Sequence, residues 1–518
     1  MRRALGIGAL CVAAGAAPAS AQAQMTTYEQ LQVFSGVLSQ IRVNYVDSVN
    51  YGTLVRAAIE GMLGSLDPHS RYVSRQDFEL NSAYEAGELA GAGIRLEEAD
   101  DAIVVLAVEP DGPADRAGIH PGDRVRAVND HPVAGLGADA VAVQFLGDKG
   151  TRLRLTLERG ARLDPDTVAV TLRRAVIDPR VVPPPRMAAP GIGYVRLAQF
   201  TPVAPKALSD AIRKARDLGA RQLILDLRGN PGGSLAAFAE IAGFFLPENV
   251  ELFHADGRTR AVRDTAFTHE KGRFATLPLV VLVDEGTASA AEILAGTLQD
   301  HDRAVVVGRR TFGKALMQSA LPLPGGDVVW LTTGRIVLPS GRLIQRTYQD
   351  INRSQYRARA GTAASADSVR EYRTSAGRAV RGSGGIEPDV GRDAAGLPLW
   401  FGAAADSGLI SAVADSVANA LPQSAEALDA WSANPGRWDS ELVVPFVARV
   451  RSRLDVRGEA AAPARERIAR ILAHRVVEVR WGADEAAEFA IRVDPDVRLA
   501  LEQFARLPAL LTGSPGSQ

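Results

Sequence analysis

Residues 192–307 alternate between continuous apolar segments and segments with helical periodicity, and this alternation strongly limits the folds open to the chain. The apolar segments lie at 192–200, 223–227, 279–283 and 304–307. The helical patterns between them lie at 205–218, 234–245 and 289–298. Continuous apolar strands are typical of a sheet that is buried on both faces, and helical connections allow parallel strands. The pattern predicts an α/β core with a mainly parallel sheet covered by helices.

Other parts of the 518-residue chain differ in pattern from this α/β core. Residues 86–175 contain short strand patterns separated by Gly and Pro, which predicts a small β-rich module. Residues 25–85 and 391–518 carry helical periodicity and predict an N-terminal helical segment and a C-terminal helical domain. Residues 346–384 are rich in Arg, Ser, Ala, Thr and Gly. They predict a mobile surface insertion within a core that spans 176–390.

The first residues have the features of an export signal. Two arginines precede an apolar stretch at 4–17, and small residues at 19–23 fit a cleavage site, so residues 1–23 are expected to be a signal peptide. The alternative is an uncleaved segment that tethers the protein to a membrane. We expect an exported protein, periplasmic or otherwise extracytoplasmic. Cys11 is the only cysteine, so removal of the signal leaves no disulfide or thiol chemistry.

Ser289, Lys314 and Gln318 form the most informative set of polar residues. Ser289 follows a buried strand pattern at the first turn of a predicted helix, where unpaired N–H groups and the helix dipole favour negative charge. A buried Lys314, flanked by Phe312 and Leu316, would have a lowered pKa and could act as a base. The Gln318 amide, at a spacing of four, could hold that amine. The alternatives are a helix cap for the serine and solvent exposure for the lysine and the glutamine.

A Gly-rich turn at 229–233 follows a second buried strand pattern and precedes a helix. Its glycines leave room for a substrate carbonyl to approach the backbone. The N–H groups of Gly232, Gly233 and Ala290 are therefore candidate oxyanion donors. A phosphate cradle is the alternative use of such a turn. The turn lacks the Gly-Lys-Ser/Thr ending and the G-x-G-x-x-G pattern, so we favour the oxyanion role.

Charge and histidine spacing argue against several other functions. The formal net charge is −1, which disfavours nucleic acid as the main partner. The 7 histidines show no metal-ligand spacing, so we expect neither a metal site nor a bound cofactor. No G-x-S-x-G elbow surrounds Ser289. His301 lies too far along the same predicted helix to serve that serine as a base.

At these motifs the chain resembles the carboxyl-terminal processing peptidases, also called tail-specific proteases. Residues 287–300 match the family's nucleophile stretch, and residues 311–318 match its lysine stretch. The D-L-R-x-N-P-G-G turn at 226–233 and the closing G-I-x-P-D-V pattern at 385–390 match as well. Ala315 departs from the pattern because it replaces the glycine that usually follows the lysine. The resemblance implies an exported serine endopeptidase that uses a Ser/Lys dyad and no cofactor.

The resemblance also implies that the β-rich module at 86–175 is a PDZ domain. Gly91, Ala92, Gly93 and Ile94 resemble its carboxylate-binding loop. By this resemblance, backbone N–H groups of the loop bind the free C-terminus of a substrate tail, which adds as a strand to the sheet edge. The expected partners are proteins or peptides with free C-termini. An adaptor protein and self-association are further expectations.

Two functions fit these residues. The first is an endopeptidase that recognises C-terminal tails through the PDZ domain and cleaves peptide bonds with the dyad. The second is a catalytically silent or adaptor-dependent scaffold that only binds peptides, since a fold does not by itself imply a function. Because Ser289, Lys314 and Gln318 are all present, we favour the endopeptidase.

Overall fold

The computed structural model describes residues 25–511 with internal gaps, so the predicted signal peptide at 1–23 lies outside the described residues. The chain divides after Ser65 into two compact units. None of the described helices combines the length and the apolar character needed to cross a membrane. The gaps in the described range are 86–89, 100–101, 110–111, 161–165, 177–180, 261, 350, 352–354, 357–358, 360–361, 363–369, 393–395, 399, 407 and 455–461.

The first unit contains helices α1 (Thr27–Asn44) and α2 (Tyr51–Gly64). Thr26 caps α1: its hydroxyl oxygen accepts a hydrogen bond from the Glu29 N–H, and the Glu29 carboxylate accepts one from the Thr26 N–H. This reciprocal capping box satisfies N–H groups that a helix start leaves unpaired, so the start of α1 is encoded locally. Large apolar side chains exposed on α1 include Tyr28, Leu31, Phe34 and Val37.

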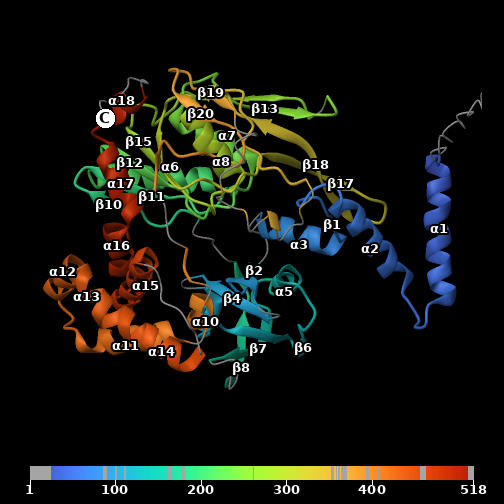
Figure 1. Cartoon of the computed structure of the whole chain (residues 1–518), viewed down its shortest axis with the longest axis horizontal. Coiled ribbons are helices and arrows are strands. Elements are labelled where there is room, and N and C mark those ends of the chain that lie inside the picture. The colour runs from blue at the N-terminus through green and yellow to red at the C-terminus, as the bar shows by residue number, and fades with distance from the viewer. Residues whose placement is uncertain are drawn as a thin grey trace, which may run out of the picture. The chain divides into compact units, whose positions relative to one another are not determined.

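A six-stranded sheet forms the core of the second unit (Figure 1). Its spatial order is β10 (Arg186–Ala189), β11 (Ile192–Arg196), β12 (Gln222–Asp226), β15 (Leu279–Val283), β16 (Val305–Gly308) and β21 (Val390–Gly391). β10 pairs antiparallel with β11, and the remaining neighbours pair in parallel. β15 and β16 are buried along their whole length, as their continuous apolar sequences require.

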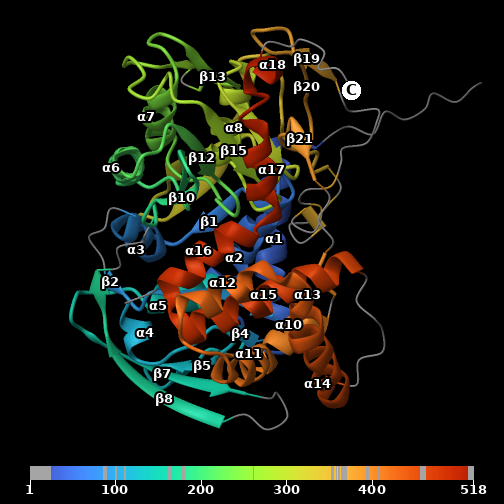
Figure 2. The same cartoon turned by 90° about the vertical axis from the view of Figure 1, so that its left-hand side faces the viewer.

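Helices cover both faces of this sheet, because alternate residues of one strand point to opposite faces. Leu223 and Val281 pack on one face with α6 (Ala204–Asp217), α7 (Leu235–Phe245) and α8 (Ala290–Asp300). Ile224 and Val280 pack on the other face with α17 (Pro495–Gln503) and α18 (Leu507–Leu511). Figure 2 shows α17 running along these strands. The sequence patterns assigned 391–518 to a separate helical domain, whereas α17 and α18 complete the core.

A second sheet is antiparallel, and the sequence patterns do not predict it. Its strands are β1 (Arg71–Val73), β13 (Glu251–Gly257), β14 (Thr265–Phe267), β17 (Leu316–Pro322) and β18 (Val328–Val337). β18 pairs with β1, β13 and β17, which brings together segments that lie far apart in the sequence. Most residues of β17 and β18 are half-buried, so these strands lack the apolar run that identifies β12 and β15.

The β-rich module has its own antiparallel sheet. The spatial order is β3 (Ile94–Ala99), β4 (Ala102–Val108), β5 (Arg124–Val128), β7 (Arg152–Arg159) and β8 (Asp166–Arg173), with β6 (His131–Pro132) paired to β5. Ile103, Phe145 and Leu155 belong to its apolar core, so the module buries a core of its own. Its other elements, and the helix before it, are α3 (Arg75–Glu85), β2 (Ala90–Gly91), α4 (Pro113–Arg116), α5 (Ala138–Gln144) and β9 (Ala175–Val176).

Part of the insertion at 346–384 is buried, which corrects the expectation of a surface segment at those positions. The side chains of Arg346, Tyr356 and Val380 are buried, and β19 (Glu371–Arg373) pairs with β20 (Ala379–Arg381). Arg378 pairs with Asp389 at 2.6 Å. The expectation was wrong here because these anchors are single residues in a polar stretch, and low average hydrophobicity hides them.

Helices α10 to α16 pack around an apolar cluster of their own. Trp431, Trp438, Phe446 and Phe489 lie in this cluster, so the amphipathic stripes of the sequence pack against one another here. The helices are α10 (Trp400–Asp406), α11 (Leu409–Ala420), α12 (Ala425–Ala433), α13 (Pro435–Trp438), α14 (Val444–Leu454), α15 (Ala462–Trp481) and α16 (Ala483–Val493), with a π-helical turn at Asp439–Val443.

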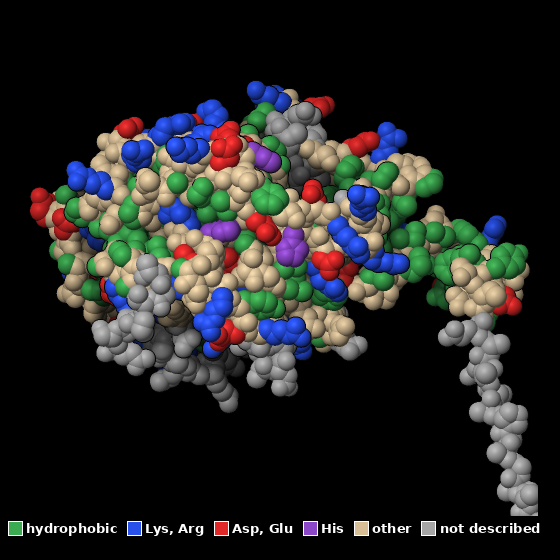
Figure 3. All heavy atoms as spheres, turned by 90° about the horizontal axis from the view of Figure 1, so that it is seen from above, with side chains coloured by type: hydrophobic (Ala, Val, Ile, Leu, Met, Phe, Trp, Pro, Cys, Tyr) green, Lys and Arg blue, Asp and Glu red, His purple; other side chains and the backbone are tan. Residues whose placement is uncertain are grey.

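Charged side chains of both signs are interspersed on the face shown in Figure 3. This agrees with the formal net charge of −1. Interspersed charges of opposite sign produce only weak long-range fields. The described side chains in this view therefore do not form the single-sign surface that nucleic-acid binding requires.

Candidate active site

Ser289 lies on a strained turn between β15 and α8. Its backbone has φ 55° and ψ −122°, which is outside the regions that residues with a side chain normally adopt. Thr287 braces the turn: its hydroxyl donates to the Leu227 carbonyl at 2.9 Å and accepts from the Asp284 N–H at 3.0 Å. Ser289 is half-buried at the N-cap position of α8. Strain of this kind persists only where the surroundings enforce it, and it is concentrated at functional sites.

Glu292, in the first turn of α8, connects the serine turn to the lysine turn. Its carboxylate accepts hydrogen bonds from the N–H groups of Ser289 at 2.9 Å, Gly313 at 2.7 Å and Lys314 at 2.8 Å. The hydroxyl of Thr311 donates to it as well. Complete burial raises the pKa of Glu292 to about 7, although these hydrogen bonds oppose the rise. The sequence analysis missed Glu292, yet its position three residues after Ser289 is the capping-box signal.

Lys314 and Gln318 lie together as the sequence analysis expected. The Lys314 side-chain nitrogen Nζ lies 3.1 Å from Gln318 Oε1, and Lys314 is half-buried. Gln318 Nε2 donates to the His69 carbonyl at 3.0 Å, which fixes the amide with its oxygen toward the lysine. Gln318 lies on β17 and Lys314 just before it, so a strand and its preceding turn, rather than one helix face, bring the two side chains together.

The Gly-rich turn packs directly on the serine turn. A Cβ atom added to Gly232 would lie 2.8 Å from the Ser289 Cβ, and one added to Gly233 would lie 2.2 Å from the Phe200 carbonyl oxygen. Both positions therefore require glycine. The Gly232 N–H donates to Asn230 Oδ1 at 2.8 Å, which engages it within the protein. Among the described residues no acceptor is found for the N–H of Gly233 or Ala290, so the geometry favours these two over Gly232 as oxyanion donors.

Asp284 joins the same two turns from the end of β15. Its Oδ1 accepts hydrogen bonds from the N–H of Gly229 at 2.8 Å and the N–H of Gly286 at 3.0 Å. Gly229 begins the Gly-rich turn, and Gly286 lies in the turn that leads to Ser289. A carboxylate that receives N–H groups from two turns restricts their relative motion. The sequence analysis did not identify this role, because it depends on the parallel pairing of β12 with β15.

The insertion reaches the lysine turn through Tyr356. The Tyr356 hydroxyl donates to the Gly313 carbonyl at 2.9 Å and accepts from Gln345 Nε2 at 2.9 Å. The Tyr356 ring contacts Phe312 edge-on at a centroid distance of 5.5 Å and His69 at 5.0 Å. The pKa of the Tyr356 hydroxyl is raised, mainly by burial, so it remains a neutral donor. Tyr356 is thus a second residue near the lysine turn that the sequence did not reveal.

Ala315, the predicted departure from the family pattern, fits the site. It is not among the described residues with positive φ, so the glycine that it replaces is not needed for the backbone conformation. Its side chain is completely buried, and its N–H donates to Gln345 Oε1 at 2.8 Å. The alanine methyl therefore fills space beside Lys314 without strain.

The predicted carboxylate-binding loop lies in the β-rich module, at the start of β3. Gly93 has φ 75°, which a residue with a side chain rarely adopts. The carbonyl groups of Ala92 and Gly93 accept hydrogen bonds from Ala114 and Glu109, so the loop has a defined shape. β3 is an end strand of its sheet. An end strand has a backbone edge to which an extended peptide can add.

The described residues hold no group of three or more His, Cys, Asp or Glu side chains that could bind a metal ion. The serine turn, the lysine turn and β17 instead supply a hydroxyl, an amine, an amide and backbone N–H groups. Such a set can activate a hydroxyl nucleophile and stabilise an oxyanion. The arrangement therefore suits acyl transfer by a serine.

Comparison with known proteins agrees with this chemistry. Residues 191–353 match the family model of Peptidase family S41, and residues 91–172 match that of the PDZ domain. A carboxy-terminal-processing protease of Bartonella bacilliformis is 33% identical over 336 residues, which cover 62% of this chain and 74% of that protein. The chain belongs to the carboxyl-terminal processing proteases of peptidase family S41. The resemblance stated from the motifs is confirmed, and the family is one of serine-type peptidases.

Other relatives cover similar parts of the chain. A carboxy-terminal processing protease of Bacillus subtilis is 31% identical over 308 residues, which cover 59% of this chain and 65% of that protein. The solved structure of a photosystem II D1 C-terminal processing protease is 28% identical, with a TM-score of 0.42, and the match covers 63% of this chain and 93% of that one. The chain thus spans slightly less than two thirds of its Bacillus relative.

Proposed function

We propose that this protein is an exported serine endopeptidase that binds protein C-terminal tails and hydrolyses peptide bonds with a Ser289/Lys314 dyad. One observation supports the pairing of Ser289 with Lys314. The buried Glu292 carboxylate accepts hydrogen bonds from the backbone N–H groups of both Ser289 and Lys314, at 2.9 Å and 2.8 Å. One rigid side chain therefore ties the nucleophile turn to the lysine turn. The contact between Lys314 Nζ and Gln318 Oε1 supports an orienting role for the amide.

In the proposed reaction the neutral Lys314 amine takes the hydroxyl proton of Ser289 while the serine oxygen attacks the scissile carbonyl carbon. The N–H groups of Gly233 and Ala290 stabilise the oxyanion that forms. The protonated Lys314 then gives its proton to the leaving amine, and the acyl group remains on Ser289. A water molecule that loses its proton to Lys314 hydrolyses this ester and restores the serine.

Tail recognition is proposed for the PDZ domain. A substrate tail would add as a strand beside β3, with its carboxylate against the loop formed by Gly91, Ala92, Gly93 and Ile94. The end position of β3 in its sheet supports this mode of binding. Amidation of the tail removes the carboxylate charge, so it should weaken binding of the tail without altering the dyad.

Export is proposed from the sequence at 1–23, where two arginines precede an apolar stretch and small residues. The relatives include a carboxyl-terminal-processing peptidase 2 named as chloroplastic in Arabidopsis thaliana, which is 35% identical over 298 residues. Mass spectrometry of the extracytoplasmic fraction should find a mature N-terminus after the predicted cleavage site. A full-length chain confined to the cytoplasm would contradict export.

The deciding experiment is cleavage of an unfolded reporter protein with an apolar C-terminal tail. Wild type should cut the reporter and react with a serine-directed fluorophosphonate, whereas Ser289→Ala and Lys314→Ala should do neither while remaining folded. Lys149→Ala, on an exposed lysine of the PDZ domain, controls for the loss of a positive charge. If wild type binds tails but neither cuts nor reacts with the probe, the protein is a peptide-binding scaffold and the proposed activity is wrong.

A further inference from the structure

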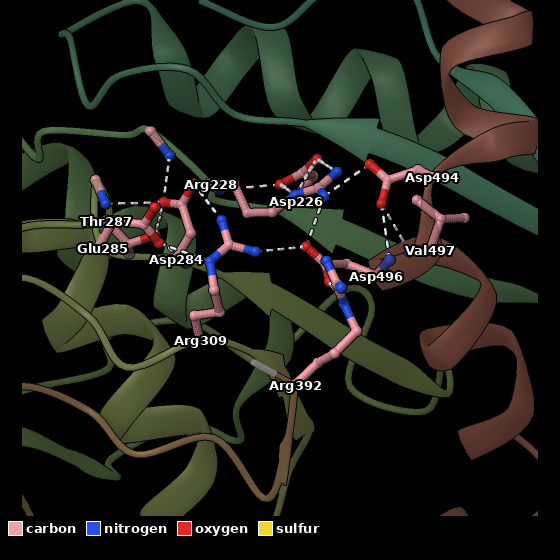
Figure 4. A network of polar contacts seen from close by, with 12 residues as sticks. Asp226, Arg228, Asp284, Glu285, Thr287, Arg309, Arg392, Asp494, Asp496 and Val497 are labelled. Carbon is pink, nitrogen blue, oxygen red and sulfur yellow. Dashed lines mark hydrogen bonds and ion pairs between the residues drawn. The ribbon is translucent and has the colours of Figure 1, made fainter. Parts of the chain in front are cut away.

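The start of α17 is joined to the loops of the core by ion pairs between buried and half-buried side chains (Figure 4). Asp494 Oδ2 accepts a hydrogen bond from Arg228 Nη1 at 2.7 Å. Asp496 accepts hydrogen bonds from Arg309 at 2.9 Å and Arg392 at 2.7 Å, and Arg228 lies 3.2 Å from it. The Asp496 side chain is only 4% exposed. The last part of the chain thus contributes two carboxylates to a network inside the protease core.

The Arg228 branch of this network leads to the Gly-rich turn. Arg228 pairs with the buried Asp226 at 2.6 Å, and Asp226 Oδ1 also accepts the Arg228 N–H at 2.9 Å. Burial alone would raise the pKa of Asp226, but the Arg228 guanidinium, together with Arg196 and the Tyr194 hydroxyl, outweighs burial and holds the pKa below its usual value. Arg228 directly precedes Gly229, so its side chain fixes the start of the turn that carries Gly233.

The Arg309 branch leads to both turns of the site. Arg309 lies 3.6 Å from Asp284 and 2.7 Å from Glu285. Asp284 in turn accepts the N–H groups of Gly229 and Gly286. Three contacts in series therefore join Asp496 to the backbone of the Gly-rich turn and of the serine turn: Asp496 with Arg309, Arg309 with Asp284, and Asp284 with the two N–H groups. The charged side chains in this series are buried or half-buried, where such contacts are stronger than at an exposed surface.

The two carboxylates are held rigidly by α17 itself. Asp494 caps the helix, and its Oδ1 accepts the N–H of Asp496 at 2.8 Å and of Val497 at 3.3 Å. Val497 and Phe504 pack on the face of the core sheet that carries Ile224 and Val280. The helix is therefore docked by apolar burial. Its first residues can act as fixed supports for the arginines.

We propose that Asp494 and Asp496 are positioning residues for peptide-bond hydrolysis, which hold Arg228 and Arg309 and through them the turns of Gly233 and Ser289. The inference rests on the proposed function, since it concerns the same site. It assigns a role in the reaction to a segment outside residues 191–353, which match the peptidase family. Loss of one carboxylate should loosen the oxyanion turn without touching the tail-binding loop of the PDZ domain.

The test compares Asp496→Asn with Asp484→Asn. Asp484 lies on α16 and also pairs with a core arginine, Arg186, at 2.7 Å, but among the described residues its side chain contacts neither turn of the site. We expect Asp496→Asn to lower kcat by about tenfold or more, with tail affinity unchanged, and Asp484→Asn to behave as wild type. The value of kcat is expressed per active serine, counted by fluorophosphonate titration. A purely structural role would lower the number of titrated serines rather than kcat per serine.

Further results test the positioning role of Asp494 and Asp496. Wild-type kcat per titrated serine in a folded Asp496→Asn protein overturns the positioning role while leaving the dyad intact. If Asp496→Asn does not fold, Asp494→Asn, which keeps the Arg309 branch, takes its place and should lower kcat less. An unchanged kcat in a folded Asp494→Asn protein then overturns the role as well. Failure of wild type to cleave or react with the probe refutes the proposed function itself, a different outcome from either of these.

Discussion

Glu292 is the side chain on which the two halves of the site depend. It accepts the N–H groups of Ser289, Gly313 and Lys314 from two segments that are also joined by the hydrogen bond from the Phe312 N–H to the Thr287 carbonyl at 3.0 Å. Its burial is complete, which is costly for a carboxylate unless hydrogen bonds compensate. The strained serine and the buried acid therefore belong to one arrangement, in which the acid holds the backbone that carries the Ser289 and Lys314 side chains.

The titration of Glu292 should be visible in the stability of the protein. In the folded protein its pKa is raised to about 7, whereas the ordinary value is 4.5. Folding therefore favours the protonated form, so this contribution to stability is fully present below pH 4.5 and is lost as the pH rises through 7. The loss amounts to about 3 kcal/mol. Glu292→Gln cannot titrate, so urea unfolding between mildly acidic and mildly alkaline pH should show a flatter profile than wild type.

The matched control for this profile is Glu240→Gln, on an exposed glutamate of α7. It should keep the wild-type dependence of stability on pH. If the stability of wild type and of Glu292→Gln depended on pH in the same way, another group would be titrating in this range. The attribution of the pH dependence to buried Glu292 would then be wrong.

Gly232→Ala should remove activity with a much smaller effect on folding. The new Cβ would meet Ser289 Cβ and the Ala290 nitrogen at 2.8 Å each, which displaces the oxyanion turn and costs about a hundredfold in kcat. Gly191→Ala is the control, because Gly191 also has positive φ but has open space around it. Both variants should lose about 1–2 kcal/mol of stability from the backbone conformation. Equal kcat values in the two variants would contradict close packing of the two turns.

At the scale of elements, the insertion at 346–384 supports the turn that carries Lys314. Tyr356 bonds to the Gly313 carbonyl, and Arg346 bonds to the Phe312 carbonyl at 3.0 Å. The sequence analysis identified the insertion by its composition, which is rich in Arg, Ser, Ala, Thr and Gly. It could not identify the two anchors, because a single tyrosine or arginine carries no periodic signal.

Tyr356→Phe tests this support. The substitution removes one hydrogen bond from the Gly313 carbonyl, which still accepts the Arg346 N–H, and one from Gln345 Nε2, which still donates to the Arg346 carbonyl. The loss of these two bonds in a buried site should cost about 1–2 kcal/mol of unfolding free energy. The lysine turn should shift, so kcat should fall severalfold while tail affinity stays constant. Tyr372→Phe, on β19 in the same insertion, should change neither quantity. Wild-type kcat in the folded Tyr356→Phe protein would show that the insertion does not support the site.

At the scale of the whole molecule, the end of the chain completes the core that the middle of the chain begins. The strands β12, β15 and β16 present Ile224, Val280 and Val305 to α17. A parallel sheet of continuous apolar strands needs cover on both faces. The helices between the core strands and α17 pack around an apolar cluster of their own. The chain therefore forms a separate helical cluster before α17 packs on the core sheet.

A chain that ends at residue 493 should therefore fail to form a soluble core. Loss of α17 and α18 exposes the apolar face that Val497, Ala500, Phe504 and Leu507 cover, and an exposed apolar surface of this kind promotes aggregation. Soluble yield, size-exclusion chromatography and binding of a hydrophobic dye would measure the effect against the chain that ends at 511. A monomeric truncated chain with the thermal stability of the longer one would show that α17 is dispensable for the core.

The sequence by itself determined the strands of the core and the chemical groups of the site. Residues 223–227 and 279–283 are continuous apolar segments, so their burial in β12 and β15 follows from hydrophobicity. Ser289, Lys314 and Gly233 were recognisable because motif residues lie close together along the chain. Only the tertiary structure decided that Glu292 joins the serine to the lysine. Such contacts connect segments far apart in sequence, and they depend on strand register and side-chain direction, which local periodicity does not encode.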